Sequence, residues 1–140
     1  MKTAQVLTIA VLLAGAGAAA AQPAIPAAAS YRNVDKARAT QQYLACLASL
    51  NEGVVVSALA QVAQMQIAHP GESFGTLHRA VGDLAHEGRT REVRSKARLV
   101  ATVLENPELF AGYADRTFDT ADEFLGAVAQ RVAESLLTAR

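Results

Sequence analysis

The stretch NEGVVVSALAQVAQMQIA, residues 51–68, decides the fold. At helical periodicity one face carries Val54, Val55, Ala58, Val62 and Met65. Almost opposite lies a second apolar face of Val56, Ala60, Ala63 and Ile67, and a narrow polar edge holds Ser57, Gln61 and Gln64. A helix that is apolar on nearly all sides is buried between layers. These residues therefore predict a helix at the centre of a domain.

Capping residues divide the rest of the chain into further helices. We expect helices that begin at caps Asn33, Asn51, Ser73, Thr90 and Thr120 and end near Leu50, Ala68, Glu87, Glu105 and Arg140. Asn106-Pro107-Glu108 starts a short additional helix. No stretch alternates apolar and polar residues over the length of a strand. The sequence thus predicts an all-α fold, a small bundle of five to six helices.

Two segments resemble each other at a shift of 39 residues. Asn51-Glu52-Gly53-Val54 opens one helix and Thr90-Arg91-Glu92-Val93 opens another, with apolar residues following at the same offsets. Periods near this length are typical of arrays of helix pairs. An internal repeat of one helix pair is therefore expected.

The start of the second segment, Val93-Arg94 followed by Ala97, resembles the second helix of a HEAT repeat. NEGVVVSALAQVAQM resembles the same motif in a neighbouring unit, so the resemblance covers residues 36–105. It implies two HEAT-like helix pairs with the last helix as a C-terminal cap. It also implies that Arg94 links successive units through an acidic partner, although Val55 stands at the equivalent place in the first unit. A compact bundle without repeat ancestry is the alternative.

The N-terminus has the pattern of a secretory signal peptide. Lys2 precedes an uncharged apolar run at residues 6–16, and small residues lead to Ala21. The run is shorter than the roughly 20 apolar residues that span a bilayer, so an uncleaved anchor is the weaker alternative. We expect residues 1–21 to be a signal peptide, 22–32 a flexible Pro/Ala-rich leader and 33–140 a single helical domain. The product would be exported, either to the periplasm or outside the cell.

The charge balance argues against bulk nucleic-acid binding, and the cysteine content excludes an internal disulfide. Removal of residues 1–21 takes away Lys2 and leaves 12 basic against 13 acidic residues. Bulk nucleic-acid binding needs a concentrated positive surface, which this balance does not supply. Cys46 is the only cysteine, so an internal disulfide is excluded. We expect Cys46 at the edge of an apolar stripe, packed as a small hydrophobe. The alternative is that Cys46 forms a disulfide with another chain.

No group of residues points to catalysis, to a metal or to a cofactor. His69, His78 and His86 lack the i, i+4 spacing of a helical metal pair. Asp122 and Glu123 suit the positive end of a helix and need no further role. No nucleophile motif or phosphate-binding glycine loop occurs in the expected domain. The protein is therefore expected to be non-catalytic, with no cofactor and no metal.

The best candidate for function is a cluster of basic residues, Arg89, Arg91, Arg94, Lys96 and Arg98. Arg91, Arg94 and Arg98 share one side of their expected helix, where they suit an acidic partner or an anionic envelope surface. A solvated face with weak ion pairs is the alternative. We expect a protein-interaction module with a protein partner. The other candidate function is a helical bundle that binds a small apolar ligand between its layers.

Overall fold

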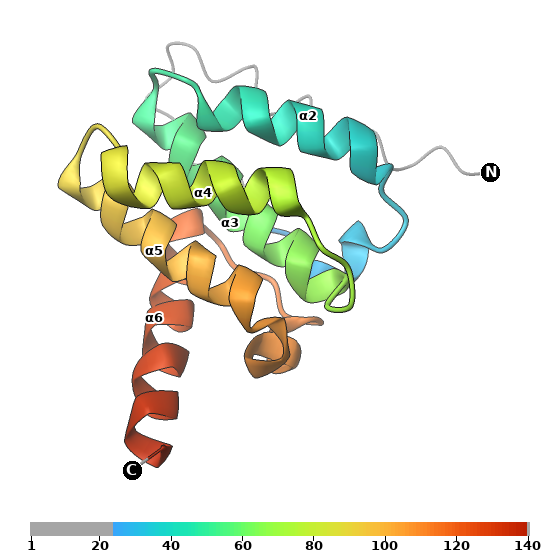
Figure 1. The fold of residues 1–140 in the computed structure, drawn as a ribbon. Helices are drawn as coiled ribbons and strands as arrows, with labels where there is room; N and C mark the ends of the chain where they lie inside the picture. The colour runs from blue at the N-terminus through green and yellow to red at the C-terminus, as the bar shows by residue number, and fades with distance from the viewer. Residues whose placement is uncertain (1–23, 140) are drawn as a thin grey trace.

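In the computed structural model, which describes residues 24–139, every regular element is a helix (Figure 1). The elements are η2 (Ala28–Tyr31), α2 (Lys36–Leu47), α3 (Glu52–Ala68), α4 (Gly75–Glu87), α5 (Arg91–Glu105), η3 (Pro107–Tyr113) and α6 (Ala121–Thr138). Between residues 24 and 139 the only β pairing is an isolated bridge from Ile25 to Phe118. None of the helices described is long and apolar enough to cross a membrane. The predicted all-α class is confirmed.

The helix α3 lies at the centre of the molecule. Every residue from Val55 to Ile67 is buried, although this stretch includes three glutamines. The helix contacts α2, α5, α6, η2 and η3, so neighbours surround it on several sides. Burial of both apolar faces removes them from water, which is the main favourable term in folding. The prediction of a central helix over residues 52–68 is therefore confirmed.

The helices α2 to α5 form two neighbouring pairs, α2 with α3 and α4 with α5. Across the pairs, α2 packs on α4 and α3 packs on α5, so helices in equivalent positions lie side by side (Figure 1). The segments related by the 39-residue shift are the starts of α3 and α5. The resemblance to the HEAT family remains a prediction.

Three of the predicted N-caps hold the helix starts assigned to them. The side chains of Asn51, Thr90 and Thr120 accept hydrogen bonds from backbone N–H groups of the first turn at 2.9, 3.1 and 3.0 Å. Asn106 does not cap the following helix, which is a 3₁₀ helix. Its Nδ2 instead donates to the Thr102 carbonyl oxygen at 3.3 Å and so closes the end of α5.

The first long helix begins later and ends earlier than predicted. Asp35, and not Asn33, caps α2, because its carboxylate accepts from the Arg38 N–H at 3.2 Å. The chain before it is still turning, since the Val34 N–H donates to the Tyr31 carbonyl oxygen at 3.3 Å. The helix ends at Leu47, three residues before the predicted end.

The start of α4 was also predicted too early. Ser73 does not cap it, and the helix begins at Gly75. Phe74, and not Ser73, stands directly before the first helical residue. The connecting turn is bonded to α3 as far as Glu72, because Gln66 Nε2 donates to the carbonyl oxygens of His69 and Glu72 at 3.0 and 2.9 Å.

The predicted flexible leader, residues 22–32, is wrong for the residues that the structure describes. Ile25 is 0% exposed and exchanges backbone hydrogen bonds of 2.9 and 3.1 Å with Phe118. Tyr31 is also buried, on the short helix η2 that packs on α3. The apolar side chains of this segment complete the core, so the domain begins before residue 33. The predicted signal peptide, residues 1–21, lies outside the described residues.

The last helix has two different halves. Phe124, Leu125 and Val128 in its first half are buried against the bundle, where α6 contacts α3 and α5. In its second half Leu136 and Leu137 are 66% and 71% exposed. Figure 1 shows this half, in red, running away from the other helices to the C-terminus. The core thus covers only the first half of the apolar side of α6, and the second half is exposed.

Candidate functional site

The residues of the predicted basic face lie on α5 and differ in their exposure. Arg91 and Arg98 are exposed and, at a spacing of seven residues, lie on the same side of the helix. Neither forms an ion pair with another residue between 24 and 139. Arg94 and Lys96 are half-buried and bonded to other parts of the fold. The predicted basic face of Arg91, Arg94 and Arg98 therefore consists of an exposed pair and of Arg94, which is bonded within the fold, as is the neighbouring Lys96.

Arg94 holds the turn between α4 and α5. Its Nη1 donates to the Gly88 carbonyl oxygen at 2.7 Å. A Cβ at Gly88 would lie 2.6 Å from the Leu84 carbonyl oxygen, so only glycine fits this close approach. The Arg94 donor thus goes to a backbone carbonyl and not to the acidic side chain that the HEAT resemblance implies. This contact makes Arg94 a residue of the fold more than of a docking face.

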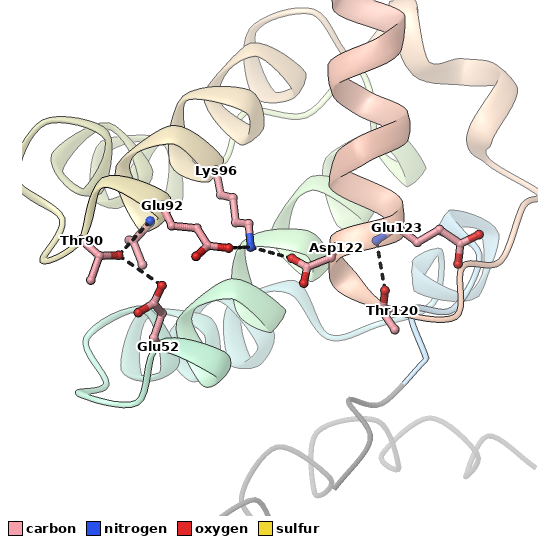
Figure 2. A network of polar contacts seen from close by, with 8 residues as sticks. Glu52, Thr90, Glu92, Lys96, Thr120, Asp122 and Glu123 are labelled. Atoms are coloured by element: carbon pink, nitrogen blue, oxygen red, sulfur yellow. Dashed lines mark hydrogen bonds and ion pairs between the residues drawn. The ribbon is translucent and has the colours of Figure 1, made fainter. Parts of the chain in front are cut away.

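An ion-pair network around Lys96 joins α5 to α6 (Figure 2). Its Nζ lies 2.6 Å from Glu92 Oε1 and 2.5 Å from Asp122 Oδ1. Desolvation alone would lower the pKa of Lys96, but the hydrogen bonds to Asp122 and Glu92 outweigh it and the pKa is raised. The two carboxylates offset the charge of Lys96, so it adds little to the basic face.

Sequence reasoning missed the role of Asp122, which it assigned only to the start of a helix. Its partner Lys96 is 26 residues away on another helix, so no local spacing reveals the pair. The Glu92–Lys96 pair, in contrast, has the i, i+4 spacing of a helical ion pair and is visible in the sequence.

A second polar bridge joins the starts of α3 and α5 (Figure 2). The Thr90 hydroxyl donates to Glu52 Oε1 at 3.2 Å and accepts from the Val93 N–H at 3.1 Å. One side chain thus caps α5 and ties it to α3. The N-terminal ends of these two helices are held next to each other at one end of the bundle.

A groove lies at this end of the bundle, between the α2–α3 and α4–α5 turns. We name it the turn groove; its volume is about 520 Å³. Its apolar lining comes from Leu47, Leu50, Val55, Leu84 and Val93. Its charged residues are Glu52, Glu87 and Arg89. The volume falls within the roughly 300–1,000 Å³ of pockets that hold bound groups.

A second groove runs between α5 and α6 and has a volume of about 620 Å³. Leu99, Leu125 and Ala129 supply apolar lining. The charged lining residues are Arg91, Glu92 and Lys96 on α5 and Asp122 on α6. The exposed Arg91 thus borders an apolar surface, which we name the α5–α6 groove. The N-terminal half of α5 therefore lies between two grooves, one toward the turns and one toward α6.

The three histidines lie apart from one another. His69 Nε2 is 3.0 Å from the Tyr31 carbonyl oxygen, and His78 Nε2 is 3.6 Å from Glu105 Oε1. His86 is exposed near the end of α4. Across residues 24–139 no three His, Cys, Asp or Glu side chains converge as metal ligands do.

Cys46 lies on α2 at the edge of the core, as the position at the edge of an apolar stripe predicted. It is half-buried and packs against the core side chains. Desolvation raises the pKa of its thiol, so the neutral form is favoured. Such surroundings suit a packed thiol and disfavour a reactive thiolate.

Comparison with known proteins gives no relative of this chain. It matches no protein-family model, no curated protein and no solved structure at a significant level.

Proposed function

We propose that this protein is an exported, non-catalytic protein-interaction module that binds an acidic segment of a partner protein through α5. The docking face is the exposed pair Arg91 and Arg98, together with the α5–α6 groove that Arg91 borders. The signal peptide proposed for residues 1–21 directs the protein to the periplasm or out of the cell. Its HEAT-like helix pairs serve as the rigid support of the docking face.

The single observation that carries the proposal is the exposure of Arg91 and Arg98 on one side of α5. Neither guanidinium is paired within the described residues, while the cation of Lys96 between them is already neutralised by two carboxylates. Arginine presents a planar fork of donors that matches a carboxylate in two-point contact.

The spacing of the pair defines the partner. Seven residues of an α-helix rise about 10 Å, so two carboxylates about 10 Å apart would meet both arginines. Such a spacing, with both side chains on one face, occurs at i, i+7 on a helix. An apolar side chain next to the first carboxylate would cover Leu99 and Leu125 in the α5–α6 groove.

The test is crosslinking in the native compartment with the double variant Arg91→Glu and Arg98→Glu, followed by partner identification. Both side chains are exposed, so the fold should be kept. The matched control is Arg38→Glu with Arg79→Glu, which makes the same charge change at exposed positions on α2 and α4. The proposal predicts a partner that the first variant loses and the control keeps. A partner profile identical in all three proteins refutes it.

The structure gives less support to the alternative of a small apolar ligand held between the layers. Of the alanines that would have to frame such a site, Ala58, Ala63 and Ala97 are fully buried in the core and Ala101 is half-buried against it. Small side chains at helix contacts let the helices approach closely. Both grooves described above lie at the surface, so a ligand would bind there and not between the layers.

A further inference from the structure

The side of α6 that lines the α5–α6 groove continues past the groove toward the end of the helix. Gly126 and Ala129 belong to the lining of the groove. Ala133 follows seven residues after Gly126, Leu136 seven after Ala129, and Leu137 eleven after Gly126. Spacings of seven and eleven residues return to the same side of an α-helix. We name these five residues the α6 strip.

The α6 strip carries no charge and is open to solvent. Leu136 and Leu137 are 66% and 71% exposed, and Gly126 and Ala133 are exposed as well. From Gly126 to Leu137 the helix rises about 17 Å, and Figure 1 shows its outer part clear of the other helices. Exposed apolar surface that continues a hollow in this way marks an interaction site.

Two basic residues at the groove form no ion pair within the described part of the chain. Lys96 is bound by both carboxylates of the lining, those of Glu92 and Asp122 (Figure 2). Arg91 lines the groove without such a partner, and the same holds for Arg98 seven residues further along α5. Three basic side chains thus stand against two carboxylates, both of which already bind Lys96. The surroundings of the groove therefore favour acidic side chains on the segment that binds there.

The walls of the groove favour a helix over an extended segment. They are side chains of α5 and α6, whose backbone groups are bonded within the helices. Between residues 24 and 139 the only β pairing is the isolated bridge of Ile25, so no sheet edge borders the groove. An extended segment would bury backbone groups without partners, whereas a helix bonds its own. The small side chains at Gly126 and Ala129 let such a helix approach closely.

We propose that the partner docks as an amphipathic helix that lies along the α6 strip and enters the α5–α6 groove. Its apolar side covers Leu136 and Leu137 and then Leu99 in the groove. Two carboxylates at i, i+7 on its edge bind Arg91 and Arg98. This inference rests on the proposed function and extends its docking face along α6, in the manner of a helix bound in a groove.

The probe is a synthetic peptide of about 18 residues, or five turns, cross-linked so that it stays helical. It carries a leucine stripe on one side and two glutamates seven residues apart at the edge of that stripe. Binding to the mature protein is measured by fluorescence anisotropy up to about 1 mM, the range of weak affinities. The same peptide without the cross-link and with two prolines in its middle cannot form the helix and should not bind.

Three variants of the protein locate the peptide. Leu136→Ser with Leu137→Ser removes the apolar end of the strip and should weaken binding about tenfold or more, because burial of two leucines is lost. Leu50→Ser, the matched control, removes an exposed leucine at the turn groove and should leave binding unchanged. Arg91→Glu with Arg98→Glu should also weaken binding about tenfold or more, since two charge pairs become repulsive.

The outcomes separate this inference from the proposed function. If the Leu136 and Leu137 variant binds like wild type while the arginine variant does not, the partner helix stops at the groove; the inference then fails and the proposed function stands. If the arginine variant binds like wild type, the basic pair is not the docking face and both fail. Equal binding of the proline peptide, or no binding of the helical one, overturns the helical partner. So does sedimentation that shows dimers of the protein alone and their loss in the leucine variant, because a second copy then covers the strip.

Discussion

Replacement of Ile25 by alanine tests whether the segment before residue 33 belongs to the folded domain. Ile25 is 0% exposed and is held in place by its two backbone hydrogen bonds to Phe118. The change removes three buried carbon groups, worth about 0.8 kcal/mol each by transfer from water. The cavity left behind adds to this, so the expected loss of unfolding free energy is about 2–5 kcal/mol. That is a large part of the roughly 5–15 kcal/mol that stabilises a small domain.

The assay is urea denaturation of the mature protein followed by far-UV circular dichroism. Ile25→Val is the graded control, because it removes one methyl group and should cost only about 0.5–1.5 kcal/mol. A chain that starts at residue 33 should lose at least as much as Ile25→Ala, since it also lacks the buried Tyr31. If that shorter chain unfolds at the same urea concentration as the mature protein, the segment is a dispensable leader and the reasoning from burial fails.

Two further predictions concern buried polar groups. Gln64→Leu should raise the unfolding free energy by about 1–3 kcal/mol, because Gln64 is 0% exposed and neither the nitrogen nor the oxygen of its amide has a hydrogen-bond partner among residues 24–139. A loss of stability in urea would contradict this, and the exposed Gln41→Leu should change little. The Lys96–Asp122 pair should contribute stability that is constant near neutral pH and disappears at high pH, because the raised pKa of Lys96 means that only its protonated form gains from folding. The stability difference between wild type and Asp122→Asn should therefore be full below about pH 10.4, the unfolded value for lysine, and should decline as the pH rises through the higher pKa of Lys96 in the folded protein. A difference independent of pH would refute the assignment.

The parts of the fold that the sequence predicts well are those set by local chemistry. The caps at Asn51, Thr90 and Thr120 act within one helical turn, so their residue types and spacing are sufficient. The central helix is equally visible, because apolar residues on two faces leave no side for solvent. The all-α class follows from these elements alone.

The features that sequence reasoning missed depend on distant contacts. Asn33 and Asp35 are both good capping residues, and the turn made by the Tyr31 carbonyl decides between them. The turn before α4 is fixed by Gln66, whose bonds to the backbone appear only when the chain folds. Ile25 stands among prolines and alanines, and its partner Phe118 is far along the chain.

In the candidate site, too, local features could be predicted from the sequence and features that depend on distant contacts could not. Helical periodicity places Arg91 and Arg98 on one side of α5, and the structure leaves both exposed there. Periodicity also places Arg94 with them, but the close turn at Gly88 gives its guanidinium a bond within the fold. The neutralisation of Lys96 by Asp122 depends on the packing of α6 on α5. Exposure within a charged face is thus a property of the tertiary structure.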